Sequence, residues 1–148
     1  VRENILLPAI IGGKINNQIE IRAEQLCDIF GIKSIQNKYP ADISGGEKQR
    51  TAVARAIINN PLLILADEPT GNLDSKSSRA VINSFEQAKK SLGATILMVT
   101  HDSFAASFCD KVIVLKDGTV WRTLEKGFMN RLEFQDHLLS AISDMGKE

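Results

Sequence analysis

The sequence predicts an α/β fold in which helices flank a parallel sheet, and three segments carry that prediction. Residues 62–66 form an apolar run that ends at two adjacent acids, Asp67 and Glu68. Residues 94–99 form a second apolar run rich in β-branched side chains. Between them, residues 75–92 repeat apolar positions with the period of a helix. Strands that alternate with helices indicate parallel pairing, because the crossover helix returns the chain to the end of the sheet where the first strand began, so that the next strand runs in the same direction.

The first thirty residues are predicted to contain one helix. Pro8 and the Gly12-Gly13 pair interrupt residues 1–15, so no regular element is expected there. Residues 18–30 carry an apolar stripe at helical spacing, and Gly31 ends it. The members of the stripe are Ile19, Ala23, Leu26, Cys27 and Phe30.

A second helix is predicted to begin at a capping box. Ser44 and Glu47 have the S-x-x-E spacing in which each side chain bonds the backbone N–H of the other residue. The helix ends before Pro61, and its apolar face holds Ala52, Val53, Ala56 and Ile57.

Residues 62–66 are short, apolar and closed by turn residues, which predicts a strand buried within a parallel sheet. In the helix over residues 75–92, Glu86 and Lys90 have the spacing of an outward ion pair, and Gly93 ends the helix. Its inward side chains are expected to be Ala80, Val81, Ser84, Phe85 and Ala88.

The C-terminal third is predicted to contain a hairpin between two helices. Residues 104–108 favour a short helix, and Lys116-Asp117-Gly118 is typical of a tight turn between residues 112–115 and 119–123. An amphipathic helix follows Gly127, with Phe134, Leu138, Ala141, Ile142 and Met145 on its apolar face.

The composition indicates an ordinary globular domain. The 148 residues are 43% apolar and 24% charged, which argues against both disorder and a membrane-spanning protein. The formal net charge is zero, so charge offers no argument for nucleic acid as a partner. Cys27 and Cys109 match no metal-ligand spacing, and each is expected to be a reduced thiol among apolar residues.

Polar chemistry follows each apolar run. Asp67 and Glu68 come directly after the first predicted strand, where open α/β sheets place their ligands. An acid there can hold Mg²⁺ through water, and its neighbour can orient or deprotonate an attacking water. His101 follows the second strand, between Thr100 and Asp102, and is a candidate for the same site.

Two glycine-bearing turns complete the candidate site. Ser44-Gly45-Gly46 opens a helix, where bare backbone N–H groups and positive potential suit a phosphate. The same residues also suit a plain capping box, and the pattern alone leaves both interpretations open. Gly71-Asn72-Leu73-Asp74 is a turn that presents a third acid soon after the first strand.

Taken together, these segments resemble the C-terminal part of an ABC-transporter nucleotide-binding subunit. ISGGEKQR resembles the signature motif of that family, LILADEP its Walker B strand, GNLD its D-loop, and THD its switch-histidine segment. The resemblance implies a P-loop NTPase core of the ABC type, with ATP and Mg²⁺ as cofactors. It also implies a partial nucleotide-binding domain divided into a signature segment (residues 1–58), a core (59–126) and a C-terminal helix (127–148).

The resemblance implies roles for three residues of the Walker B and switch segments. Asp67 would hold Mg²⁺, Glu68 would be the catalytic base that acts on water, and His101 would contact the γ-phosphate.

For the other two motifs the implied roles lie across a dimer. Ser44, Gly45 and Gly46, with Glu47, would bind the nucleotide held by the opposite subunit, and Asp74 would bridge the two subunits. Ile43 and Glu47 depart from the Leu and Gln that are usual in the family.

The phosphate loop of the family, G-x-x-x-x-G-K-[ST], is missing from this sequence. Gly13-Lys14 is the only Gly-Lys pair near the N-terminus, but Ile15 follows it and Pro8 stands where the first glycine belongs. We therefore expect that the chain is a fragment that begins past that loop, that it hydrolyses ATP only at background rate by itself, and that the apolar strand over residues 94–99 has an open edge.

The tail, KDGTVWRTLEKG and the helix after it, resembles the end of the ATPases of bacitracin-type peptide resistance. The implied function is ATP hydrolysis that drives export of antimicrobial peptides. The implied partners are a second nucleotide-binding subunit and a transmembrane permease, with the chain on the cytoplasmic face of the membrane.

Two other functions stay open at this point. A chromosome-maintenance or DNA-repair ATPase shares the motifs, but heptads and basic charge are absent from this sequence. A module without catalysis could instead donate its signature face to a partner's ATP, although it would have no use for Asp67, Glu68 and His101.

Overall fold

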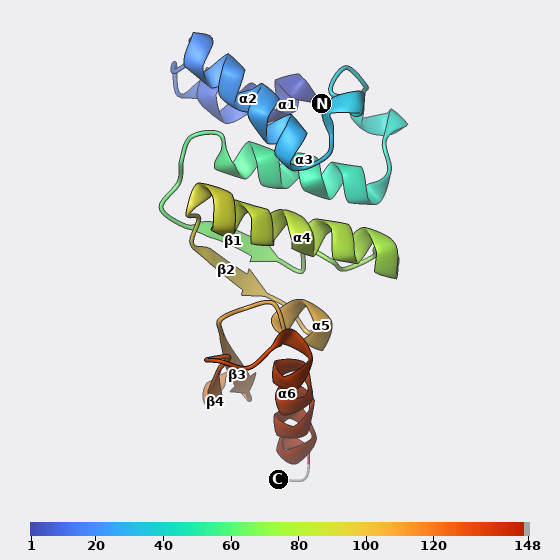
Figure 1. The fold of residues 1–148 in the computed structure, drawn as a ribbon, viewed down its shortest axis with the longest axis vertical. Helices are drawn as coiled ribbons and strands as arrows, with labels where there is room; N and C mark the ends of the chain where they lie inside the picture. Colours follow the sequence, from blue (N-terminus) through green and yellow to red (C-terminus); the bar gives the residue numbers. More distant parts are fainter. Residues whose placement is uncertain (147–148) are drawn as a thin grey trace. The chain divides into compact units, whose positions relative to one another are not determined.

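The computed structural model describes residues 1–146 and divides into two compact units, Val1–Met98 and Val99–Glu148 (Figure 1). The predicted α/β class is confirmed, because helix α4 connects the two neighbouring parallel strands of one sheet. The predicted division of the domain at residues 58 and 126 stays a prediction.

Helices form most of the first unit. Helices α1 (Arg2–Ile11) and α2 (Asn17–Ile29) pack on each other and on α3 (Gly45–Ile57), and α4 (Ser75–Leu92) also packs on α3 (Figure 1). Two short 3-10 turns, Lys33–Ile35 and Pro40–Asp42, lie between α2 and α3. The core of this unit includes Ile5, Leu6, Ala9, Ala23, Leu26, Cys27, Ile32, Val53, Ala54, Ile57, Ile58, Val81, Ile82, Phe85 and Ala88.

The expectation of an irregular N-terminus is wrong, because α1 is helical through Pro8. Proline removes one backbone hydrogen bond and crowds the preceding turn, so the helix needs compensation from elsewhere. Burial supplies it: Ile5, Leu6 and Ala9 are at most 4% exposed. The chain start is also tied down, since the Arg2 N–H donates to the Gln36 carbonyl at 2.9 Å.

The other predicted helices of this unit are confirmed. Gly31 and Gly93 follow α2 and α4 with φ of +62° and +65°, the left-handed geometry that ends a helix. One contact between these helices has no sequence signal. The Arg22 side chain on α2 donates to the carbonyls of Ile58 and Ile57 at 2.9 and 3.2 Å, so a cation lies at the C-terminal end of α3, where the helix dipole favours it.

Strands β1 (Ile64–Asp67) and β2 (Ile96–Val99) form a two-stranded sheet. The Ile64 N–H donates to the Thr95 carbonyl at 2.9 Å beside the start of β2. Within the described residues β2 pairs with β1 alone, which agrees with the expected open edge.

The expectation that the first strand is buried on both faces is wrong. Side chains alternate along the pair, as a pleated strand requires, and one set is exposed: Leu65 is 72%, Leu97 53% and Val99 58% exposed. Leu62 and Leu63, just before β1, are exposed as well. A pair of short strands has too little surface to bury both faces by itself.

The second unit contains a hairpin and two helices, as predicted. Its elements are α5 (Ser103–Ala106), β3 (Lys111–Lys116), β4 (Thr119–Glu125) and α6 (Arg131–Met145). The strands are antiparallel, and Asp117 and Gly118 both have positive φ in the turn between them. Its buried core is made of Leu124, Phe134, Leu138 and Ala141, with Ala106, Val112, Val114, Trp121 and Met129 packed around it.

Three smaller expectations differ from the structure. Ala56 was expected on the apolar face of α3 but is exposed. Ile142 was expected on the apolar face of α6 but is 40% exposed. Cys27 is buried as expected, whereas Cys109 is only half-buried, and the two cysteines form no disulfide.

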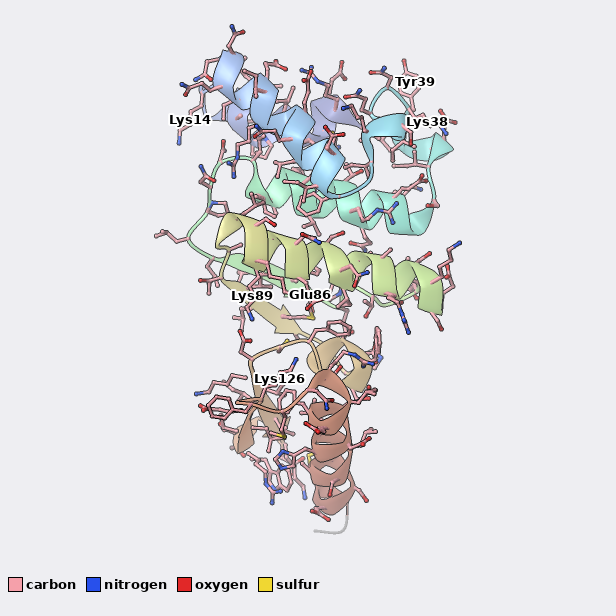
Figure 2. The ribbon with its side chains drawn as sticks, viewed as in Figure 1. Lys14, Lys38, Tyr39, Glu86, Lys89 and Lys126 are labelled. Carbon is pink, nitrogen blue, oxygen red and sulfur yellow. The ribbon has the colours of Figure 1, made fainter. Side chains whose placement is uncertain are left out.

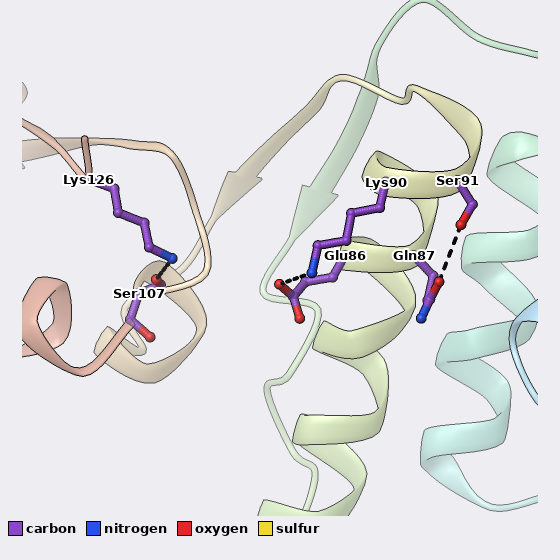
Figure 3. Close-up of polar contacts among 6 residues, drawn as sticks. All are labelled: Glu86, Gln87, Lys90, Ser91, Ser107 and Lys126. Atoms are coloured by element: carbon purple, nitrogen blue, oxygen red, sulfur yellow. Dashed lines mark hydrogen bonds and ion pairs between the residues drawn. The ribbon is translucent and has the colours of Figure 1, made fainter. Parts of the chain in front are cut away.

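Polar and charged side chains, among them Lys14, Glu86, Lys89 and Lys126, project from the elements of both units (Figure 2). The predicted pair on α4 is present, since Lys90 Nζ lies 3.3 Å from Glu86 Oε1 (Figure 3). In the second unit, Lys126 Nζ donates to the Ser107 carbonyl at 3.3 Å (Figure 3). Exposed pairs of this kind stabilise a fold by at most about 1 kcal/mol.

Candidate functional site

The predicted capping box at the start of α3 is present. Glu47 Oε2 accepts hydrogen bonds from the Ser44 N–H at 2.8 Å and from the Ser44 hydroxyl at 2.9 Å. The Glu47 N–H in turn donates to Ser44 Oγ at 3.3 Å. We call residues 44–47 the signature turn.

These bonds decide which charges the signature turn carries. The backbone N–H and the hydroxyl of Ser44 lower the pKa of Glu47, so its carboxylate is ionised at neutral pH. The Ser44 hydroxyl proton already points to that carboxylate. A phosphate that binds here through Ser44 has to compete with Glu47 for the proton.

The predicted acids lie at and just past the end of β1. Asp67 is the last residue of the strand and its side chain is exposed. Glu68 follows with φ of +42°, a backbone conformation that is costly for a residue with a Cβ. A turn holds it there, since the Gly71 N–H donates to the Glu68 carbonyl at 3.0 Å.

Asp74, the third predicted acid, is the N-cap of α4. Its Oδ1 accepts from the backbone N–H groups of Lys76 at 2.9 Å and Ser77 at 3.0 Å, and its Oδ2 accepts from the Ser77 hydroxyl at 2.7 Å. The Ser77 hydroxyl and N–H lower the pKa of Asp74, so this cap is ionised at neutral pH. We call residues 71–74 the D-loop turn.

The structure brings the signature turn and the D-loop turn together within one unit. A Cβ built on Gly45 would lie 3.1 Å from Leu73 Cδ2, and one built on Gly46 would lie 3.1 Å from Ser77 Cβ. The starts of α3 and α4 therefore lie side by side (Figure 1). Two helix N-termini in contact combine their positive potential, and an anion is the ligand that such a place favours.

Sequence reasoning missed Leu73 and Ser77 as parts of this site. Ser77 lies inside a helix and Leu73 inside a turn, so neither carries a chemical pattern of its own. The two glycines of the signature turn were the available signal, since a glycine can mark close approach of other protein atoms as well as of a ligand.

His101 lies in the second unit, just past β2, and its side chain is exposed. Its neighbours are ordered by local bonds: Thr100 Oγ1 accepts from the Asp102 N–H at 3.0 Å, and Asp102 Oδ1 accepts from the Phe104 N–H at 2.9 Å. Asp102 is therefore the cap of α5. That His101 meets Asp67 and Glu68 at one nucleotide stays a prediction.

The acids fit the magnesium prediction in type and number. Among residues 1–146 no group of three or more His, Cys, Asp or Glu side chains is placed so that it could hold a metal ion. Magnesium sites that use substrate phosphates need only one or two carboxylates, because phosphates and waters complete the shell. The exposed Asp67 carboxylate at the end of β1 suits that kind of site.

Comparisons with known proteins agree with the motifs. A family model described as ABC transporter matches residues 1–71. The chain is 47% identical over 146 residues to the uncharacterized ABC transporter ATP-binding protein YvcR of Bacillus subtilis, a match that covers 99% of this chain and 56% of that protein. It is 44% identical to the bacitracin export ATP-binding protein BceA of Halalkalibacterium halodurans, over 99% of this chain and 58% of that one. It is also 44% identical to the lipoprotein-releasing system ATP-binding protein LolD 2 of Caulobacter vibrioides, over 78% of this chain and 51% of that one.

Solved structures support the same conclusion. The ATP-binding cassette MJ0796, in a dimeric post-hydrolysis state bound to ADP and Pi, matches with a TM-score of 0.68 and 36% identity, over 84% of this chain and 55% of that one. The chain belongs to the family of ABC transporter ATP-binding proteins. It spans little more than half the length of the curated relatives it matches.

No helix among the described residues is both long enough and apolar enough to pass through a lipid bilayer.

Proposed function

We propose that this chain is the part of an ATP-hydrolysing transporter subunit that carries the signature turn, the acids after β1, the D-loop turn and the switch histidine. In this proposal Asp67 holds Mg²⁺ and Glu68 draws a proton from the attacking water. His101 contacts the γ-phosphate. Magnesium, when bound, neutralises charge on the phosphates of ATP.

One observation carries the proposal: the signature turn packs directly on the D-loop turn, which follows the acids of β1 after a single tight turn. The signature turn, the acids after β1 and the D-loop turn therefore share one compact unit, whereas His101 lies in the other. An isolated capping box or an isolated acid pair would have no reason to show this arrangement.

The proposed assembly is a dimer with each ATP between two subunits. Ser44, Gly45, Gly46 and Glu47 of one subunit face the ATP held by the other, and Asp74 lies beside that contact. The dimeric state of the cassette MJ0796 supports this arrangement. We further propose that a transmembrane permease is the second partner and that it holds the subunit at the cytoplasmic face of the membrane.

The transported substrate is proposed to be an antimicrobial peptide. Similarity to a bacitracin export protein over 99% of the chain supports this choice. Similarity to lipoprotein-releasing proteins favours a second candidate, an acylated protein, although it extends over 78% of the chain. In both cases the cargo is an amphiphile, and the permease selects it.

The test is ATP hydrolysis by the complete gene product in its permease complex. Glu68→Gln removes the proposed base but keeps the size of the side chain, so turnover should fall by at least about a hundredfold while ATP binding persists. Glu125→Gln, an equal charge change in an exposed ion pair, is the matched control and should keep turnover. Wild-type turnover in Glu68→Gln would show that Glu68 is not the base.

A second measurement distinguishes an ATP-hydrolysing subunit from a module that only donates its signature turn to a partner's ATP. The 148-residue chain by itself should hydrolyse ATP only at background rate, since it has no G-x-x-x-x-G-K-[ST] loop to hold the phosphates. Robust turnover by the isolated chain would overturn that expectation. If the complete gene product also fails to hydrolyse ATP, that result would favour the non-catalytic module.

A further inference from the structure

Gly46 lies against a part of α4 that has little freedom to move. A Cβ at Gly46 would come within 3.1 Å of Ser77 Cβ and 3.3 Å of Ser77 Oγ. Ser77 is held from the other side, because its hydroxyl and its N–H both donate to Asp74, at 2.7 and 3.0 Å. Its side chain cannot rotate away without losing the hydrogen bond from its hydroxyl to Asp74 Oδ2.

Gly45 makes a softer contact of the same kind. A Cβ there would lie 3.1 Å from Leu73 Cδ2, at the free end of a half-buried side chain. The Leu73 backbone is itself restrained by a 3.3 Å hydrogen bond from its N–H to the Thr70 carbonyl. Consecutive residues of the signature turn thus contact consecutive parts of the segment from Leu73 to Ser77.

We propose that Leu73 and Ser77 are positioning residues that lock the signature turn to the D-loop turn, so that Ser44 and Asp74 are presented to the opposite subunit as one rigid body. Both turns must meet the same nucleotide, and a displacement of about 1 Å between them is enough to cost catalysis heavily. The glycines at 45 and 46 are required for this packing, in addition to any contact with phosphate. This inference rests on the proposed function.

The decisive experiment is a double-mutant cycle in the complete gene product with its permease. Gly46→Ala should lower turnover by about tenfold, because its methyl group pushes on Ser77. Ser77→Gly removes the atoms in its way, so the double variant should recover most of the lost turnover. Binding of ATP to the monomeric subunit, measured with a fluorescent nucleotide, should stay unchanged in all three variants.

Recovery of turnover in the double variant distinguishes two reasons for a glycine at position 46, which are packing against Ser77 and contact with a phosphate. If Gly46 is glycine only because a phosphate approaches its backbone, Ser77→Gly cannot restore turnover, and that result would overturn the inference while leaving the proposed function intact. A wild-type complex without any ATP turnover would remove the proposed function and the inference together.

A second pair of variants avoids the introduced clash. Leu73→Ala leaves space beside Gly45, so it should lower turnover and weaken ATP-driven dimerisation in the Glu68→Gln background. Leu73→Met, which refills the space, should restore both, and Leu62→Ala at a 95% exposed position is the control. Normal turnover and dimerisation in Leu73→Ala would contradict the inference.

Discussion

Asp74 shows how one carboxylate can serve structure and a predicted interface together. Both of its oxygens accept hydrogen bonds from the first turn of α4. A bridge to an opposite subunit would therefore start from a side chain whose position is already set. Pre-set side chains lose less conformational entropy on binding, which favours the interface.

The cap makes a pH-dependent contribution to stability. Because the pKa of Asp74 is lower in the folded chain than in the unfolded one, the ionised cap favours folding above pH ~4 and this contribution disappears as the pH falls through the lowered value. We expect Asp74→Ala to lower the urea midpoint at neutral pH, and the difference from wild type to vanish in acid. Urea unfolding followed by circular dichroism, from about pH 2.5 to about pH 7, measures this difference, because that range spans the ordinary Asp pKa of about 3.9.

Asp74→Asn is the matched control for that series. Asparagine can also accept from the N–H groups of Lys76 and Ser77 but does not titrate, so its difference from alanine should be independent of pH. A wild-type advantage that persists undiminished at the lowest pH would contradict the assignment of the cap as its source.

His101 carries the prediction that belongs to the second unit. His101→Ala should cripple ATP turnover in the complete gene product and leave ATP binding unchanged, because the imidazole is proposed to act on the γ-phosphate after binding. The chain has two histidines, and His137 lies exposed on α6. His137→Ala is therefore a matched control that should keep full turnover. Equal turnover in both variants would count against the assigned role of His101.

At the scale of elements, α4 has a clear structural signal at each of its two ends. A carboxylate cap starts it at Asp74, and Gly93 ends it with φ of +65° and with nothing within 4 Å of an added Cβ. A substitution at Gly93 therefore tests backbone conformation alone.

We expect Gly93→Ala to destabilise the chain by about 1 kcal/mol, because alanine pays a steric cost in the left-handed region. Gly146→Ala is the matched control: Gly146 ends α6 with φ of −77°, and the nearest atom to its added Cβ is 3.6 Å away. Chemical denaturation should show a loss for the first variant and little change for the second. Equal effects would show that helix-end strain does not govern either position.

At the scale of the whole molecule, the exposed apolar face of the β1–β2 pair is the feature that we expect to govern self-association. Leu65, Leu97 and Val99 are all more than half exposed, on a strand pair with an open edge within the described residues. Apolar strands of this kind promote association between chains.

Leu97→Lys should therefore reduce self-association of the chain, measured by sedimentation velocity, while the unfolding free energy changes by no more than about 0.5 kcal/mol. Gln87→Lys adds the same charge at an exposed position on α4 and is the control for net charge. If both variants reduce association equally, charge and not the apolar face is the cause.

The sequence by itself determined the type and order of most elements, because local signals control them. The period of apolar residues specifies α4, the box of Ser44 and Glu47 starts α3, and the turn at Asp117 and Gly118 specifies the hairpin. The acids after β1 and the family resemblance could also be predicted from the sequence, since both depend on short contiguous motifs.

Only the tertiary structure decided the rest, because it depends on contacts between residues far apart in the sequence. Packing on α2 and α3 keeps α1 helical in spite of Pro8, and the small size of the β1–β2 sheet leaves Leu65 exposed. The same holds for the fit of Gly46 against Ser77, which is set by how α3 and α4 align. No local pattern encodes an alignment of two helices, since it emerges from the shape of the side chains that fill the space between them.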